Sequence, residues 1–193
     1  MERRLAAVLV SDVVGYTKLM EEDTEGTVTA WSEARDDIIE PSVQSHKGRI
    51  VKFTGDGFLT EFKTVQDALN CAIHLQNSLF ESPLKFRMAV NLGDIIDDGR
   101  DIHGEGINIA ARLEALAEPG GICISGALYD QVRNRINAKY EELGFQDVKN
   151  VSEPVMAYNV SAKINLGEET KPENLAGDLS IAVLPFDNMS NDP

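Results

Sequence analysis

Two aspartates, Asp12 and Asp56, stand at the ends of segments that a folded sheet can bring together. Asp12 lies near the end of residues 6–14, a nearly continuous apolar run that admits one polar pair. Such a run is typical of a buried strand. A carboxylate at the exit of a buried strand is costly unless a cationic group meets it. Asp12 therefore predicts a specific partner near the end of the first strand.

Asp56 lies in the turn Gly55-Asp56-Gly57, between two short β-type runs. Glycine on either side of an aspartate is typical of a hairpin turn. If the two strand ends meet, the carboxylates of Asp12 and Asp56 face each other and repel. A bound divalent cation usually relieves the repulsion between two such carboxylates.

Composition limits the function classes. The chain has 193 residues, which suits one domain with a tail, and 42% of them are hydrophobic, which is enough for a real core. The formal net charge of −14 argues against a nucleic-acid-binding surface and against a polybasic membrane contact. An anionic nucleotide is not excluded, because nucleotide sites bring their own metal and local cations.

The two cysteines, Cys71 and Cys123, fall in apolar segments and lack metal-ligand spacing. We interpret both as buried thiols of a reducing compartment, and we expect the protein to be cytoplasmic. No charged-then-apolar leader opens the chain, and no apolar run approaches 18 residues. The sequence therefore predicts neither a signal peptide nor a membrane span within these residues.

The first half of the chain alternates strand and helix patterns in the order βαββαβ. The expected elements are strand 5–14, helix 23–45, strands 49–54 and 57–62, helix 65–80 and strand 84–92. This order predicts an α+β fold with a ferredoxin-like core, in which the first strand runs antiparallel to the third. That arrangement puts Asp12 and Asp56 side by side. We expect Asp23 to cap the first helix and Pro41 to kink or shorten its last turn.

The second half predicts a C-terminal α/β extension of the same domain. A helix is expected over 105–117, with Asn108 and Arg112 on one face because they are four residues apart. The other expected elements are strand 122–125, helix 126–136 and strands 138–148 and 155–160. We expect the domain to span residues 1–160, a polar linker to span 161–177, and residues 178–193 to begin a truncated downstream region.

Three motifs resemble the catalytic domain of class III adenylate and guanylate cyclases, over roughly residues 4–160. They are Ser-Asp-Val-Val-Gly-Tyr-Thr at 11–17, Lys-Phe-Thr-Gly-Asp at 52–56, and Asp-Ile-His-Gly-Glu-Gly-Ile-Asn-Ile-Ala-Ala-Arg at 101–112. The aspartates of the first two motifs are 44 residues apart. The third motif has an asparagine seven residues after its aspartate and an arginine four residues later. Three motifs in order at matching spacing are a much stronger signal than any one of them.

The resemblance implies an adenylate cyclase, which converts ATP to 3′,5′-cyclic AMP and pyrophosphate. It implies that Asp12 and Asp56 hold two Mg²⁺ or Mn²⁺ ions per site. It also implies that Lys52 and Asp101 read the base, with the lysine donating to adenine N1 and the carboxylate accepting from the 6-amino group.

The same resemblance implies that Asn108 orients the ribose and Arg112 stabilises charge on the transferring phosphoryl group. Lys149 resembles a family lysine that contacts the triphosphate, although the glycine usual after it is absent. Arg100 is the only residue near the position of a second phosphate-binding arginine, and we assign it no role. Family members form sites shared between two protomers, so the resemblance implies a homodimer.

Other interpretations remain. Asp12 and Asp56 are also common cap and turn residues. The chain could be a degenerate cyclase fold that serves as a dimerising regulatory module, or a ferredoxin-like binding domain without chemistry. A calcium loop over 94–105 is rejected, because Ile96 stands where a ligand is required and a strand precedes it.

Overall fold

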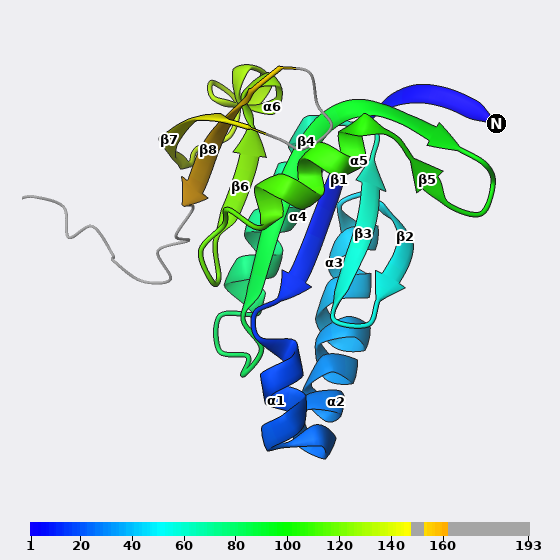
Figure 1. The fold of residues 1–193 in the computed structure, drawn as a ribbon, viewed down its shortest axis with the longest axis vertical. Helices are drawn as coiled ribbons and strands as arrows, with labels where there is room; N and C mark the ends of the chain where they lie inside the picture. Colours follow the sequence, from blue (N-terminus) through cyan, green and yellow to red (C-terminus); the bar gives the residue numbers. More distant parts are fainter. Residues whose placement is uncertain (148–152, 162–193) are drawn as a thin grey trace, which may run out of the picture.

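An eight-stranded sheet organises the protein, with most helices on one of its faces and a single helix, α5, on the other (Figure 1). The computed structural model describes residues 1–147 and 153–161. The strands are β1 (Glu2–Val13), β2 (Arg49–Thr54), β3 (Gly57–Phe62), β4 (Phe86–Asp97), β5 (Ile102–His103), β6 (Ile122–Ser125), β7 (Lys139–Gln146) and β8 (Val155–Ser161). The helices are α1 (Tyr16–Glu22), α2 (Thr24–Glu33), the π-helix η1 (Ala34–Ile39), α3 (Glu40–Ser45), α4 (Val65–Ser78), α5 (Glu105–Glu114) and α6 (Gly126–Val132).

The strand order is β2-β3-β1-β4-β6-β8-β7, with β5 paired to β4. The first four strands form an antiparallel unit in which β1 lies between β3 and β4. This is the ferredoxin-like arrangement predicted from the βαββαβ order, and the prediction is confirmed. The extension begins where β6 joins β4 in parallel, and β8 and β7 follow it antiparallel.

The apolar run of β1 is explained by cover on both faces of the sheet. Leu9 points into the main core under α2–α4, and Val8 points into a smaller core under α5; both are fully buried. A strand buried on both sides needs apolar residues at every position instead of an alternation. The predicted buried thiols are confirmed as well. Burial raises the pKa of Cys71 and of Cys123 to about 12, so both stay protonated at neutral pH.

The helix expected over 23–45 is present, but Pro41 does not shorten it. Asp23 caps α2 as predicted, its Oδ1 accepting from the N–H of Gly26 at 2.9 Å. The helical path then widens into η1, where the N–H of Glu40 bonds to the carbonyl of Arg35, five residues back. Proline lacks an N–H and clashes with the carbonyl four residues before it. The wider turn just before Pro41 relieves both problems, and the helix continues to Ser45.

Other differences are the short helix α1, which was not among the expected elements, and several element boundaries. The strand expected over 84–92 runs on to Asp97 and is met there by β5, which the sequence did not predict. The helices expected over 105–117 and 126–136 end at Glu114 and Val132. Lys149, the linker 161–177 and the segment 178–193 lie outside the described residues. Among those that are described, no helix is long and apolar enough to cross a membrane.

A close backbone contact fixes α5 on the sheet. A Cβ atom on Gly93 of β4 would lie 2.6 Å from the Cα atom of Gly106 in α5, so only glycine allows this approach. The buried side chain of Asn91 adds a hydrogen bond, in which Nδ2 donates to the carbonyl of Gly106 at 2.8 Å. The contact sets the height of α5, and therefore of Asn108 and Arg112, above the strands.

We expect Gly93→Ala to push α5 away from β4 and to lower the free energy of unfolding by about 1–3 kcal/mol, the usual cost of overpacking. Urea titration followed by circular dichroism measures the change. Ala111→Ser, on the exposed side of the same helix, is the matched control and should stay within about 0.5 kcal/mol of the parent. A Gly93→Ala protein as stable as the parent would show that the contact does not constrain α5.

Candidate active site

The end of β1 brings the two predicted aspartates together. Asp12 is in register with Gly57 of β3 on one side and with Arg87 of β4 on the other. The N–H of Val13 donates to the carbonyl of Asp56 at 2.9 Å, which ties the hairpin turn to the strand end. The carboxylates of Asp12 and Asp56 therefore lie side by side, as the predicted topology requires.

The carboxylate of Asp12 is partly buried and lies beside a like charge, that of Asp56. Burial is the larger cause that raises its pKa, and repulsion from Asp56 raises it further. Arg87 opposes both, because its Nη2 donates to Oδ2 of Asp12 at 3.0 Å. Asp12 thus sits in a position where its charged form is costly and where one guanidinium offsets only part of that cost.

Arg87 and Glu114 belong to the same cluster, and neither was recognised from the sequence. Arg87 Nε lies 2.9 Å from Oε1 of Glu114, a buried residue at the end of α5. The pKa of Glu114 is raised, first by burial and then by the charges of Asp12 and Asp56, against the attraction of Arg87. A single arginine inside the apolar strand expected over 84–92 was the available signal, since antiparallel pairing with β1 places it opposite Asp12.

The cluster fits a divalent cation. Asp12 and Glu114 pair with Arg87, and Asp56 adds a third carboxylate beside Asp12, so the fully ionised cluster has a deficit of positive charge. Mg²⁺ takes oxygen ligands and is typically held by one or two carboxylates, with waters and substrate phosphates completing its shell. The adjacent Asp12 and Asp56 match this donor set. In residues 1–147 and 153–161, no group of three or more His, Cys, Asp or Glu side chains is arranged to hold a metal ion.

Lys52 and Asp101, predicted as a pair, form an ion pair and a hydrogen bond. The Lys52 ammonium holds the pKa of Asp101 below its ordinary value, helped by the N–H of Ile102, which donates to Oδ1 at 2.8 Å. A β-bulge between Ile50 and Lys52 makes this placement possible. Ile50 packs in the main core under the helices, whereas Lys52 reaches Asp101 on the opposite face.

Asn108 and Arg112 lie on the exposed side of α5, opposite the buried Ala110 and Leu113. This confirms the predicted division of the helix into two faces. Neither polar side chain forms a hydrogen bond or ion pair with another residue of the described chain, so both are available to a ligand. Arg100, which was given no role, is exposed in the turn before β5.

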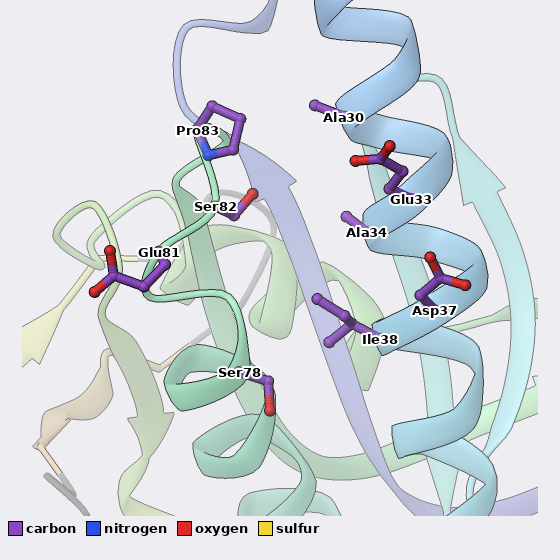
Figure 2. A pocket seen from close by; sticks show the side chains of 9 residues that line it. All are labelled: Ala30, Glu33, Ala34, Asp37, Ile38, Ser78, Glu81, Ser82 and Pro83. Atoms are coloured by element: carbon purple, nitrogen blue, oxygen red, sulfur yellow. The ribbon is translucent and has the colours of Figure 1, made fainter. Parts of the chain in front are cut away.

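A hollow of about 330 Å³ lies elsewhere, between α2–η1 and the loop after α4. Figure 2 shows Glu33 and Asp37 on the helix side of this hollow, with Ser82 and Pro83 on the loop side. It contains none of the predicted site residues and lies on the face of the sheet that α2–α4 cover. We therefore place the candidate site at the strand ends and not in this pocket.

Comparison with known proteins finds relatives and solved structures that are named as cyclases. No family model matches the chain. Over 207 aligned residues the chain is 41% identical to a Rhizobium meliloti protein named "Putative adenylate cyclase 3", covering all of this chain and 35% of the relative. The chain thus spans about a third of the length of that relative.

Two solved structures show the same fold. One, an adenylate/guanylate cyclase/hydrolase from Silicibacter pomeroyi, is 36% identical with a TM-score of 0.79, covering 83% of this chain and 98% of the other. The second, the adenylyl cyclase CyaB from P. aeruginosa, is 25% identical with a TM-score of 0.73, covering 86% of this chain and 100% of the other. The likeness extends over nearly the whole length of both solved chains.

Proposed function

The chain belongs to the class III adenylate/guanylate cyclase family, and from this premise we propose that it converts ATP to 3′,5′-cyclic AMP and pyrophosphate. The observation that carries the proposal is the carboxylate pair of Asp12 and Asp56 at adjacent strand ends, in a cluster short of positive charge. In the reaction the ribose 3′-oxygen attacks the α-phosphorus, its proton is lost, and the bond to the pyrophosphate oxygen breaks.

Asp12 and Asp56 would hold two Mg²⁺ or Mn²⁺ ions. When bound, such ions supply activation of the 3′-hydroxyl and neutralisation of the triphosphate charge. The chain itself contributes two carboxylates whose mutual repulsion is relieved by binding a cation. Asp12 is also fixed in place by the pairing of β1 with both neighbouring strands.

Lys52 and Asp101 would select adenine. Their ion pair keeps Asp101 ionised, and therefore an acceptor, at neutral pH. Adenine offers an acceptor at N1 and a donor at its 6-amino group, which match an ammonium and a carboxylate. Guanine offers a donor at N1 and an acceptor at O6, so the same pair disfavours it.

Asn108 and Arg112 would act on the ribose and the phosphoryl group. The amide of Asn108 can hold the ribose in the orientation that aligns its 3′-oxygen. Arg112 can donate to oxygens that gain charge in the transition state. Both side chains are exposed on the same side of α5, four residues apart, which suits a shared ligand. Lys149, outside the described residues, is proposed as a further triphosphate contact.

The complete site would be shared by two copies of the chain in a homodimer, with Asp12 and Asp56 from one protomer and the base and phosphoryl residues from the other. Support comes from the face of the sheet that carries Lys52. The apolar side chains of Val10, Val51 and Ile107 on this face are only partly buried within one chain. A second protomer would cover this face. We also propose a cytoplasmic location, a role in intracellular signalling and a downstream region in the full-length protein.

Neither alternative is favoured by a specific observation. A degenerate regulatory module would be expected to lose a metal aspartate, the asparagine or the arginine, and this chain retains all of them. Two neighbouring carboxylates at adjacent strand ends lower stability when no cation is bound. A ferredoxin-like binding domain without chemistry would have no need for this arrangement.

The decisive experiment is formation of cyclic AMP from ATP with Mn²⁺ or Mg²⁺. Asp12→Ala and Asp56→Ala should each lower the rate by about 10²-fold or more, the scale for loss of a main electrostatic group. The exposed Glu141→Ala is the matched control and should keep the parental rate. Circular dichroism checks that all variants fold. Parental activity in either aspartate variant would contradict the two-metal assignment.

We expect the parent to prefer ATP to GTP, since Lys52 and Asp101 match the adenine edge. The double variant Lys52→Glu with Asp101→Cys should erode this preference, measured as the ratio of kcat/KM for the two nucleotides. The size of the ratio, and not the rate alone, reports base reading. A parent protein that cyclises GTP at least as well as ATP would refute the assignment.

Shared sites predict complementation between inactive variants. Asp12→Ala and Arg112→Ala should each be nearly inactive alone, because every site of either homodimer lacks one part. Random exchange makes half of the dimers mixed, and each mixed dimer has one intact site. A 1:1 mixture should therefore recover about a quarter of the parental activity at saturating protein. Subunit exchange without recovery, or full activity of a strict monomer, would exclude shared sites.

A further inference from the structure

Arg87 lies between two carboxylates that come from different elements. Its Nη2 donates to Oδ2 of Asp12 at 3.0 Å, and its Nε lies 2.9 Å from Oε1 of Glu114. The side chains of Arg87 and Asp12 are about equally exposed, at 28% and 30%, whereas that of Glu114 is only 11% exposed. Glu114 is the last residue of α5, so this helix reaches the carboxylate pair through Arg87.

The two contacts of Arg87 differ in kind. The Asp12 contact is a hydrogen bond, whereas Arg87 Nε and Glu114 Oε1 lie 2.9 Å apart without forming a well-aligned one. Arg87 Nε and Glu114 Oε1 are both buried and both lack a hydrogen-bond partner in the described structure. Guanidinium and carboxylate groups form strong hydrogen bonds when they are aligned. Better alignment of this buried pair would therefore strengthen its interaction.

Arg87 and a divalent cation would compete for Asp12. Both are positive, and both bind the same carboxylate, so a cation on Asp12 repels the guanidinium and weakens its hydrogen bond to Asp12. Arg87 then requires another anion, since an unpaired charge in a partly buried place is costly. Among the described residues, Asp12 and Glu114 are the carboxylates that form ion pairs with Arg87. A small rotation of the guanidinium would align Nε–H with Glu114.

We propose that Glu114 is a positioning residue that takes over Arg87 from Asp12 when Asp12 binds a divalent cation. The inference rests on the proposed metal site at Asp12 and Asp56. Glu114 acts through Arg87 and contacts neither cation nor nucleotide. Its carboxylate therefore supports cation affinity, and this support is needed only while Arg87 is present to compete.

Binding of Mn²⁺ alone, followed by electron paramagnetic resonance of the free ion without nucleotide, tests this idea in four proteins. These are the parent, Glu114→Gln, Arg87→Gln and the double variant. Glu114→Gln should weaken Mn²⁺ binding about tenfold or more, the usual effect of losing a group that supports a metal ligand indirectly. The double variant should return to within about threefold of the parent, because the competitor is gone. Arg87→Gln alone should bind at least as tightly as the parent.

The same titration separates the inference from the proposed function. Asp12→Ala should abolish Mn²⁺ binding, and if it does not, the metal site itself is wrong. If Asp12→Ala abolishes binding while Glu114→Gln binds like the parent, the metal site stands and the role of Glu114 is refuted. A double variant as weak as Glu114→Gln would show that Glu114 supports structure only and would equally refute it.

A second readout covers the case in which Glu114→Gln fails to fold. In the ¹⁵N spectrum of the parent, the Nε–H signal of Arg87, assigned by its loss in Arg87→Gln, should move downfield when diamagnetic Mg²⁺ is added. The shift reports the new hydrogen bond to Glu114. The conservative Glu114→Asp variant should show a smaller shift. An Arg87 signal that does not respond to Mg²⁺ concentrations that saturate Asp12 would overturn the proposal.

Discussion

The pairing of β1 between β3 and β4 is the constraint on which the rest of the site depends. It sets Asp12 against Gly57 and Arg87 in one register. A slip of one residue would turn Asp12 into the core under α2–α4 and bring Ser11 to the face that carries α5, because side chains alternate along a strand. Ser11 instead points inward, and its hydroxyl donates to the carbonyl of Arg87 at 3.0 Å. Hydrophobic burial on both faces therefore fixes where the carboxylates stand.

This register concentrates unfavourable charge at one point of the molecule. Burial and repulsion from Asp56 oppose ionisation of Asp12, and Glu114 is subject to the same two effects. Elsewhere acidic groups are better compensated: Glu61 and Asp97, for example, share the guanidinium groups of Arg4 and Arg49. A site that keeps uncompensated carboxylates close together gives up stability that a cation can restore, which is the usual relation between stability and function.

The sequence predicted those parts of this arrangement that depend on regular patterns. Strand order followed from the βαββαβ pattern, and the meeting of Asp12 and Asp56 followed from strand order. The bulge before Lys52 and the π-helix before Pro41 were missed, because each is a one-residue adjustment that depends on tertiary packing. Glu114 was missed for a different reason. A glutamate next to the buried Leu113 has no local reason to be buried, and only the reach of Arg87 from β4 explains its position.

Helix α5 connects the two halves of the chemistry within one chain. Its buried end places Glu114 against Arg87 beside the chain's own Asp12. Its exposed side carries Asn108 and Arg112, which in the proposed homodimer belong to the other site. The contact of Gly106 with β4 brings the helix close to the sheet between these two sets of residues. In the proposed homodimer one helix therefore carries residues of two sites, with Glu114 beside the cation site of its own chain and Asn108 and Arg112 in the other site.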